Sequence, residues 1–313
     1  MHSLRLLLKE VNGFLPKNIK NVKNISFFVL LIASGGDIIK LSVVRIIAHC
    51  RKTKTIGGNF MSFDFTNQVA IVTGASSGIG LLFCQEWARL GGKVAMCARS
   101  IDKLEAYAAE LNEKYGNCAL GVKCDVQNYE DICAARDATV EAFGRIDVLV
   151  NAAGGNAMRM RGISFSVEFP DVPIEVFDWG LDLNLKGPFY FGHAVLKQMR
   201  EQKSGLIINV GSITGAEGTA ASMDYATSKA GLMYGLTKSQ ARYGSKHGIR
   251  SVCISPGPVL TREAMSKMKT LMGRAGEVQE IIDLMLFVAS DKGQFINGEN
   301  IMIDGGRNAM GRA

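Results

Sequence analysis

The feature that most constrains the fold is an alternation, from Gln68 onward, of short apolar runs with longer segments of helical spacing. Segments 81–91 and 102–116 have helical spacing and end at a glycine. Strands that alternate with helices favour parallel crossovers. We therefore predict one α/β domain over 61–313, a doubly wound, mostly parallel seven-stranded sheet with helices on both faces. The predicted strands are 68–74, 93–99, 119–125, 146–154, 205–212, 249–257 and 300–306.

The first 60 residues differ from the rest in charge. They hold ten basic and two acidic residues, so of the net charge of +7 they carry +8 and the remaining 253 residues carry −1. A nearly neutral body gives no support to nucleic-acid binding, which needs a basic surface. The apolar run 25–33 is shorter than the roughly 20 residues of a membrane-spanning helix, so we expect no membrane partner.

The segment "IGGNFM", residues 56–61, suggests where the native protein starts. It can be encoded with an AGGAGG run shortly before an AUG, the layout of a bacterial ribosome-binding site. We hypothesise that Met61 is the native start and that the leader, residues 1–60, is translated upstream sequence.

The cysteines indicate the cellular compartment. Seven are present, at positions 50, 84, 97, 118, 124, 133 and 253, and no pair has C-x-x-C spacing. An odd count without a metal or redox spacing is typical of reduced, mostly buried thiols. We therefore expect a cytoplasmic protein without a metal site.

A glycine-rich turn, "TGASSGIG" at 73–80, lies between the first predicted strand and the first predicted helix. Glycines allow a sharp turn and the close approach of a pyrophosphate, and a helix start supplies amide donors to that anion. The spacing is G-x-x-x-G-x-G, at Gly74, Gly78 and Gly80. A plain structural turn is the alternative, but the strand–turn–helix context favours a nucleotide site.

The end of the second predicted strand bears on the choice of nucleotide. An acidic residue there would bind a ribose 2′-hydroxyl, whereas this chain has Ala98 and Arg99. A cation suits a 2′-phosphate, so NADP is preferred over NAD. The alternative is that Arg99 is a solvated surface residue.

Tyr225 and Lys229 stand four residues apart in "YATSK", which places both side chains on one face of a helix. A nearby ammonium stabilises a phenolate and moves the phenol pKa towards neutrality, which suits acid–base catalysis. Ser212 ends the fifth predicted strand, where its hydroxyl can bind a substrate oxygen. "NAAG", 151–154, and "PGPVLT", 256–261, also follow predicted strands, whereas Asn184 is expected in a helix.

These motifs, in this order, resemble the short-chain dehydrogenase/reductase family from Phe65 to Gly306. The resemblance implies a Rossmann-type fold and hydride transfer between a nicotinamide and a carbonyl or alcohol carbon. It implies that Tyr225 is the acid/base, Lys229 its activator, Ser212 the group that polarises the carbonyl, and Asn184 the holder of a relay water. It also implies a homotetramer or a homodimer built through helices near 184–200 and 225–243.

The resemblance further assigns the cofactor contacts. Ser77 departs from the pattern, because members that prefer NADP often have a basic residue there, which weakens the NADP preference. The implied cofactor-binding residues are Gly74, Ser76, Ser77, Gly78, Ile79, Gly80, Arg99, Asp125, Val126, Asn151, Ala152, Gly154, Tyr225, Lys229, Pro256, Gly257, Val259 and Thr261.

The segment 154–173 is longer than a minimal connection and is expected to overhang the site. Together with "NAAGGN" it resembles gluconate 5-dehydrogenase-like and fructuronate reductase-like members, which implies a sugar acid or a similar small polyol or keto acid as substrate. Arg159 or Arg161 can pair with a substrate carboxylate, but solvated loop arginines are the favoured interpretation. Met158 and Met160 are expected to pack the loop.

Two other functions stay open. A 3-oxoacyl-thioester reductase needs a basic patch for an acidic carrier, and Lys267, Lys269 and Arg274 are its candidates. A non-catalytic nucleotide-binding protein is the second alternative, although the intact Ser212, Tyr225 and Lys229 argue against it.

Overall fold

The structure is a computed structural model that describes residues 63–310. The predicted leader, residues 1–60, lies outside the described residues and stays a prediction. The seven predicted strands are confirmed: β1 Val69–Thr73, β2 Lys93–Ala98, β3 Ala119–Lys123, β4 Val148–Asn151, β5 Gly205–Val210, β6 Ile249–Pro256 and β7 Asn300–Ile303. They form one sheet in the order β3-β2-β1-β4-β5-β6-β7, and every pair is parallel.

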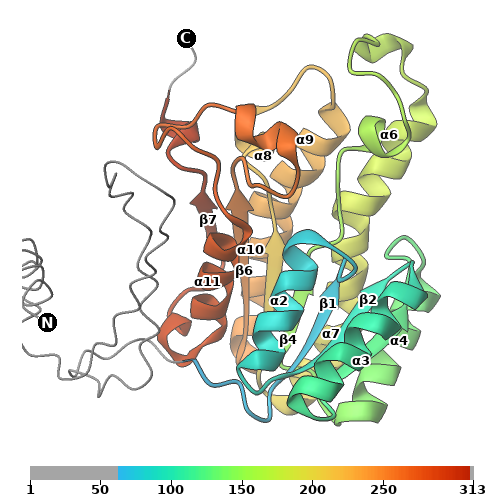
Figure 1. Ribbon diagram of the computed structural model, residues 1–313, viewed down its shortest axis with the longest axis vertical. Coiled ribbons are helices and arrows are strands. Elements are labelled where there is room, and N and C mark those ends of the chain that lie inside the picture. The colour runs from blue at the N-terminus through green and yellow to red at the C-terminus, as the bar shows by residue number, and fades with distance from the viewer. Residues whose placement is uncertain (1–62, 311–313) are drawn as a thin grey trace, which may run out of the picture. The chain divides into compact units, whose positions relative to one another are not determined.

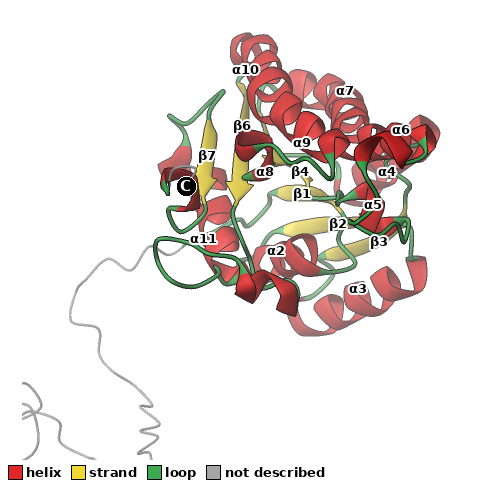
Figure 2. Ribbon diagram, turned by 90° about the horizontal axis from the view of Figure 1, so that it is seen from above, coloured by secondary structure: helices red, strands yellow, loops and turns green. Residues whose placement is uncertain are grey.

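Helices cover both faces of this sheet, with α2, α3 and α11 on one side and α4, α7 and α10 on the other (Figure 2). Their bounds are α2 Gly78–Arg89, α3 Ile101–Tyr115, α4 Tyr129–Phe143, α7 Gly187–Gln202, α10 Thr237–Gly244 and α11 Val278–Ala289. The predicted helical segments 81–91 and 102–116 thus correspond to α2 and α3. This is the doubly wound Rossmann-like fold that the alternating pattern predicts.

The central strands are apolar throughout because both of their faces are buried. In β1, Ala70 and Val72 pack on the side of α2 and α11, whereas Ile71 packs on the side of α4 and α7. Trp87 of α2 is fully buried and stacks on Phe65, and its indole N–H donates to the Lys93 carbonyl at 3.0 Å. This contact fixes α2, which follows the glycine-rich turn, against the sheet.

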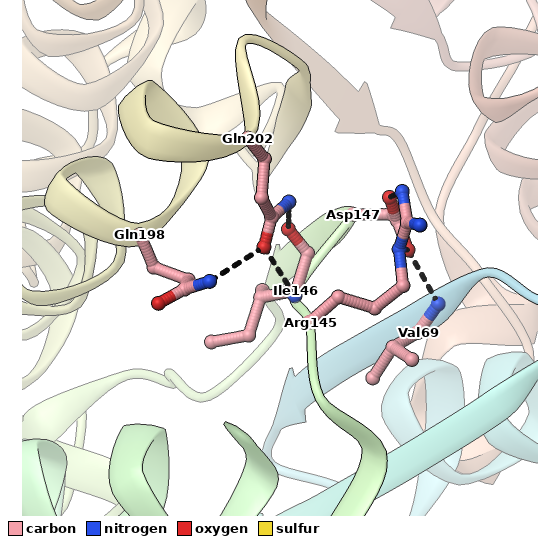
Figure 3. A network of polar contacts seen from close by, with 6 residues as sticks. All are labelled: Val69, Arg145, Ile146, Asp147, Gln198 and Gln202. Atoms are coloured by element: carbon pink, nitrogen blue, oxygen red, sulfur yellow. Dashed lines mark hydrogen bonds and ion pairs between the residues drawn. The ribbon is translucent and has the colours of Figure 1, made fainter.

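The amino ends of β1 and β4 are joined by a network of polar contacts (Figure 3). The Asp147 carboxylate accepts from the Val69 N–H at 2.9 Å and pairs with Arg145 at 2.6 Å. The Gln202 side chain, at the end of α7, accepts a hydrogen bond from the Ile146 N–H and donates one to the Ile146 carbonyl. It also accepts a hydrogen bond from the Gln198 side chain. The network lies at the sheet edge opposite to the carboxyl ends.

The long connection after β4 has a small core of its own. It contains the short helix α5, Ala157–Met160, and the helix α6, Ile174–Leu181. Met158 is fully buried and packs with Ala157, Val172, Val176 and Phe177, as predicted, whereas Met160 is exposed. The connection therefore has a packed base from which exposed residues extend.

The six cysteines within 63–310 are all free thiols, and five of them are buried. Among the same residues, no group of His, Cys, Asp or Glu has a metal-binding arrangement. No helix in the described part of the chain is long and apolar enough to cross a membrane.

Candidate active site

A cavity of about 560 Å³ opens at the carboxyl ends of the strands, the edge towards which the arrows of β6 and β7 point in Figure 1. Loops after β4, β5 and β6 and the helix α9, Met223–Ala230, supply its walls. The site residues predicted from the sequence that line it are Ile79, Ala152, Gly154, Ser212, Tyr225, Lys229, Pro256, Gly257, Val259 and Thr261.

Two glycines of the glycine-rich turn, Gly74 and Gly80, have no room for a side chain. Gly74 has φ +67°, and a Cβ there would lie 2.9 Å from the backbone of Ala153. A Cβ on Gly80 would lie 2.6 Å from the carbonyl oxygen of Gly74. The start of α2 lacks a side-chain cap, since Ser77 makes no cap hydrogen bond. A bare turn beside an uncapped helix start fits the pyrophosphate of a dinucleotide.

The loop after β4 is held by the turn and by Asn184. The Thr73 hydroxyl accepts from the backbone N–H groups of Ala152 and Ala153 at 3.0 and 2.9 Å. The Asn184 amide bonds both the N–H and the carbonyl of Gly155, each at 2.9 Å, and donates to the Gly180 carbonyl. Its side chain therefore shapes the loop, and its predicted part in a proton relay stays a prediction.

Asn184 lies in a π-helical segment, Asp182–Lys186, between α6 and α7. The helical placement predicted for it is thus correct, although the hydrogen-bond pattern there is not α-helical. Such single-turn π segments recur at functional sites because they displace one residue of a helix out of register.

Tyr225 and Lys229 lie on one face of α9, as predicted from their spacing. The Lys229 amine is buried, donates to the Val210 carbonyl at 2.7 Å and lies 5.7 Å from the centre of the Tyr225 ring. Ser212, just after β5, lines the same cavity, and its hydroxyl acts to lower the pKa of the Tyr225 phenol. The three groups proposed to carry the reaction therefore converge at one wall of the cavity.

Burial sets the pKa values of this pair. Desolvation lowers the pKa of Lys229 to about 8. Burial also raises the pKa of Tyr225 above its ordinary value, because it outweighs the opposing hydrogen bond from Ser212 and the charges of Arg262 and Arg159. The prediction that a neighbouring ammonium lowers the Tyr225 pKa is therefore wrong for this state of the protein. The net shift is upward, and the cations that oppose it are the two arginines.

Other predicted residues lie outside the cavity wall. Arg99 follows β2 and is exposed. Asn151 is buried at the end of β4, and its side-chain amide donates to the Asn209 side chain at 2.9 Å. Asp125, after β3, accepts from the Gln127 N–H and shapes its own turn. Val126, which follows Asp125, also lies outside the cavity wall, as do five residues of the glycine-rich turn: Gly74, Ser76, Ser77, Gly78 and Gly80.

Several cavity residues were not among the predicted site residues, and the polar ones include Asn156, Arg262 and Arg307. Asn156 caps α5 and donates to the Ser222 hydroxyl. Arg307 reaches the site from the far end of the chain and pairs with Glu217 at 2.9 Å. Arg262 directly follows the "PGPVLT" motif, and this position beside a predicted site motif could have indicated that it lies in the site. For Arg307 the sequence has no such signal, because its partner lies 90 positions away.

Comparison with known proteins agrees with this geometry. Residues 68–271 match the family model for short chain dehydrogenase. A 3-oxoacyl-[acyl-carrier-protein] reductase of Vibrio cholerae is 34% identical over 256 residues, 78% of this chain and 98% of the relative. D-threitol dehydrogenase of Mycolicibacterium smegmatis is 34% identical over 259 residues, 79% of this chain and 95% of the relative. Trans-4-hydroxycyclohexanecarboxylate dehydrogenase of Sinomonas cyclohexanicum is 36% identical over 251 residues, 77% and 93%.

A solved structure is similar as well. L-Sorbose reductase from Gluconobacter frateurii, complexed with NADPH and L-sorbose, superposes with a TM-score of 0.72 at 26% identity, over 80% of this chain and all of that one. The chain belongs to the short-chain dehydrogenase/reductase family. It is an NAD(P)-dependent oxidoreductase that acts on CH–OH groups.

Proposed function

We propose that this oxidoreductase interconverts a ketone and a secondary alcohol on a small polyol or sugar acid, with Ser212, Tyr225 and Lys229 as its reacting groups. The convergence of these three side chains at one wall of a cavity carries the proposal. A bound nicotinamide supplies or accepts the hydride. Every other task falls to the protein: binding the substrate oxygen, moving a proton and holding both reactants.

The roles follow from the contacts. The Ser212 hydroxyl and the Tyr225 phenol line the same cavity, so a carbonyl oxygen placed against both accepts a hydrogen bond from each. As charge develops on that oxygen, Tyr225 donates its proton, and its raised pKa keeps it protonated at neutral pH. Lys229 is held to the Val210 carbonyl and faces the Tyr225 ring, so it holds the phenol in place for this transfer. Asn184 orders the Gly155 loop beside them.

For the cofactor we propose NADP over NAD. Arg99 follows β2, next to the strand that ends in the glycine-rich turn, and the Cys97 carbonyl accepts from the N–H of Ala75 in that turn. A cation at this position suits a 2′-phosphate. The similar L-sorbose reductase binds NADPH. Ser77, which is not basic, leaves Arg99 as the principal contact.

Arg99→Gln tests this preference. Loss of a charged hydrogen bond to a phosphate costs about 1.5–3 kcal/mol, so we expect the KM for NADPH to rise about 10- to 100-fold and that for NADH to change less than threefold. Initial rates with both nucleotides measure it, with the exposed Arg89→Gln as control. Equal effects on both nucleotides would argue against a 2′-phosphate contact.

The polyol or sugar-acid substrate rests on the polar, partly cationic cavity and on relatives whose names give small hydroxylated substrates. The rival is a 3-oxoacyl-thioester reductase, which the Vibrio relative favours. Lys267 and Lys269 are exposed and remain available to an acidic carrier, but Arg274 pairs with Glu280 at 2.7 Å. The basic patch that a carrier needs is thus smaller than the sequence allowed.

A substrate panel separates the two functions. The full chain is assayed for oxidation of NADPH and NADH with keto sugar acids, ketoses, simple ketones and acetoacetyl thioesters. We expect turnover of keto sugar acids or ketoses at a kcat/KM at least tenfold above that of the thioesters. Turnover of acetoacetyl thioesters alone would replace this proposal by its rival.

We also propose a cytoplasmic homotetramer or homodimer formed through α7 and α9–α10. Exposed aromatic side chains on these helices, Phe189, Tyr234 and Tyr243, support such an interface. The free thiols support a reducing compartment. Light scattering of the full chain, with Phe189→Glu as the disrupting variant, tests the assembly.

A further inference from the structure

The charged side chains of the cavity are unbalanced. Within residues 63–310, four cationic residues line it, and Glu217 is the single carboxylate among the lining residues; the four are Arg159, Lys229, Arg262 and Arg307. Two of the cations are already engaged. Arg307 pairs with Glu217, and Lys229 is held to the Val210 carbonyl behind Tyr225.

Arg159 and Arg262 are the two that remain. Neither has a carboxylate partner in the described part of the chain. Arg159 extends from α5, after β4, and Arg262 from the loop after β6, so two separate crossovers bring them to one cavity. Arg262 keeps a single weak side-chain contact, at 3.8 Å to the Met265 sulfur.

The two guanidinium groups also interact electrostatically. The pKa of Arg159 lies below its ordinary value, because of burial first and of the charge of Arg262 second. Both charges lower the pKa of Tyr225, so both groups lie near the phenol. Both side chains line the cavity and are exposed, so water weakens the repulsion between them, and an anion bound between them would remove what remains.

We propose that Arg159 and Arg262 together bind a carboxylate of the substrate and so place its carbonyl carbon against Ser212 and Tyr225. The inference rests on the proposed function and deepens it, since it selects acids over neutral polyols. Two guanidinium forks offer paired N–H donors that match the two oxygens of a carboxylate. The substrate class is therefore hydroxy or keto acids with an anionic end remote from the reacting carbon.

Arg161 provides a matched control. It has the same charge and stands two positions from Arg159, but its guanidinium lies over the Trp179 ring, 5.5 Å from the centre, and it does not line the cavity. The sequence could not separate Arg159 from Arg161 as the carboxylate partner, and the structure directs only the first into the site.

The binding arm uses the full chain saturated with NADPH and two matched pairs, gluconate with glucitol and threonate with threitol. Each acid differs from its alcohol by oxidation of one terminal hydroxymethyl group. By titration calorimetry we expect an acid to bind at least about tenfold more tightly than its alcohol. Arg159→Gln and Arg262→Gln should each remove this difference, and Arg161→Gln should keep it.

The activity arm compares 5-keto-gluconate with L-sorbose, which differ in the same terminal group. We expect each of the two cavity variants to lower kcat/KM for the acid about 10- to 100-fold and for sorbose less than threefold. If neither compound is reduced, the proposed function fails while calorimetry still decides the anion site. Equal affinity for acid and alcohol in both pairs would overturn the inference. So would variants that weaken NADPH instead, because the arginines would then serve the nucleotide.

Discussion

Polar side chains are paired at the amino ends of the strands of the sheet, whereas some of the described ones at the carboxyl ends lack a hydrogen bond of normal geometry. At the amino ends, Arg145, Asp147 and Gln202 have partners that join β1, β4 and α7 (Figure 3). At the carboxyl ends, Lys229 is buried against one carbonyl, and Asp224 and Ser228 have buried side-chain oxygens without a hydrogen bond of normal geometry within 63–310. The first edge is arranged for stability, whereas the second keeps groups that stability alone would remove.

The largest effect should come from Tyr225→Phe, at the carboxyl edge. Removing the phenol oxygen removes the proton donor, so kcat should fall about 10²- to 10⁴-fold, while the Kd for the nucleotide and the Tm change little. Stopped assays at high enzyme concentration and calorimetry measure these quantities. Tyr115→Phe, which alters an exposed tyrosine of α3, is the control. Unchanged turnover in Tyr225→Phe would refute its role as acid/base.

At the amino edge a substitution should lower the stability of the protein and leave its kcat nearly unchanged. Asp147→Ala leaves the Val69 N–H and Arg145 without their acceptor, which costs about 1–3 kcal/mol of unfolding free energy. The kcat should stay within threefold of wild type, because the network is remote from the cavity. Denaturant unfolding and steady-state rates check both statements. A large loss of kcat at full folding would show that the two edges are coupled.

Lys229→Met should separate function from stability. Burial lowers the Lys229 pKa from 10.5 to about 8, which corresponds to a penalty of about 3 kcal/mol for the charged amine at neutral pH. Methionine removes that penalty and also the bond to Val210, so we expect a net gain of about 1–2 kcal/mol, with kcat reduced at least about 100-fold.

The pH dependence gives an independent measurement of the same residue. Below about pH 8 the amine is protonated in both the folded and the unfolded protein. Between about pH 8 and 10.5 the unfolded chain holds a proton that the folded protein has released, so this group makes stability rise with pH. Lys229→Met should lose that rise in Tm. A variant with the wild-type slope would show that the amine is not desolvated.

These contrasts show what the sequence could predict. The strands and the glycine-rich turn were predictable because each depends on local constraints: continuous apolar runs for buried strands, and glycines where backbone approaches backbone. Tyr225 and Lys229 were predictable because their spacing fixes a shared helix face. The pairing of Arg307 with Glu217 and the approach of Arg159 to Arg262 were not, since each joins residues from separate crossovers. The sign of the Tyr225 pKa shift depends on burial, which no motif specifies.

The smallest expected effect concerns Asp224, which precedes Tyr225 in α9. It is 5% exposed and lies against Gly180 of α6. Burial raises its pKa, and the N–H groups at the helix start offset this only in part. The folded protein thus holds the proton to higher pH than the unfolded chain does. Stability from this group is present below pH 3.8, the ordinary value, and is lost as pH rises through the folded pKa.

Asp224→Asn removes this loss, so we expect the Tm at pH 7 to rise by about 1–2 °C and its decline between pH 4 and 7 to flatten. The kcat should stay within threefold, and Asp178→Asn, an exposed aspartate of α6, should change neither quantity. Calorimetric scans across this pH range make the measurement. A lower Tm, or a kcat reduced more than tenfold, would mean that the carboxylate is paired during turnover. Asp224 would then take part in turnover together with the other residues at the carboxyl ends of the strands, and catalysis would require its burial beside Tyr225.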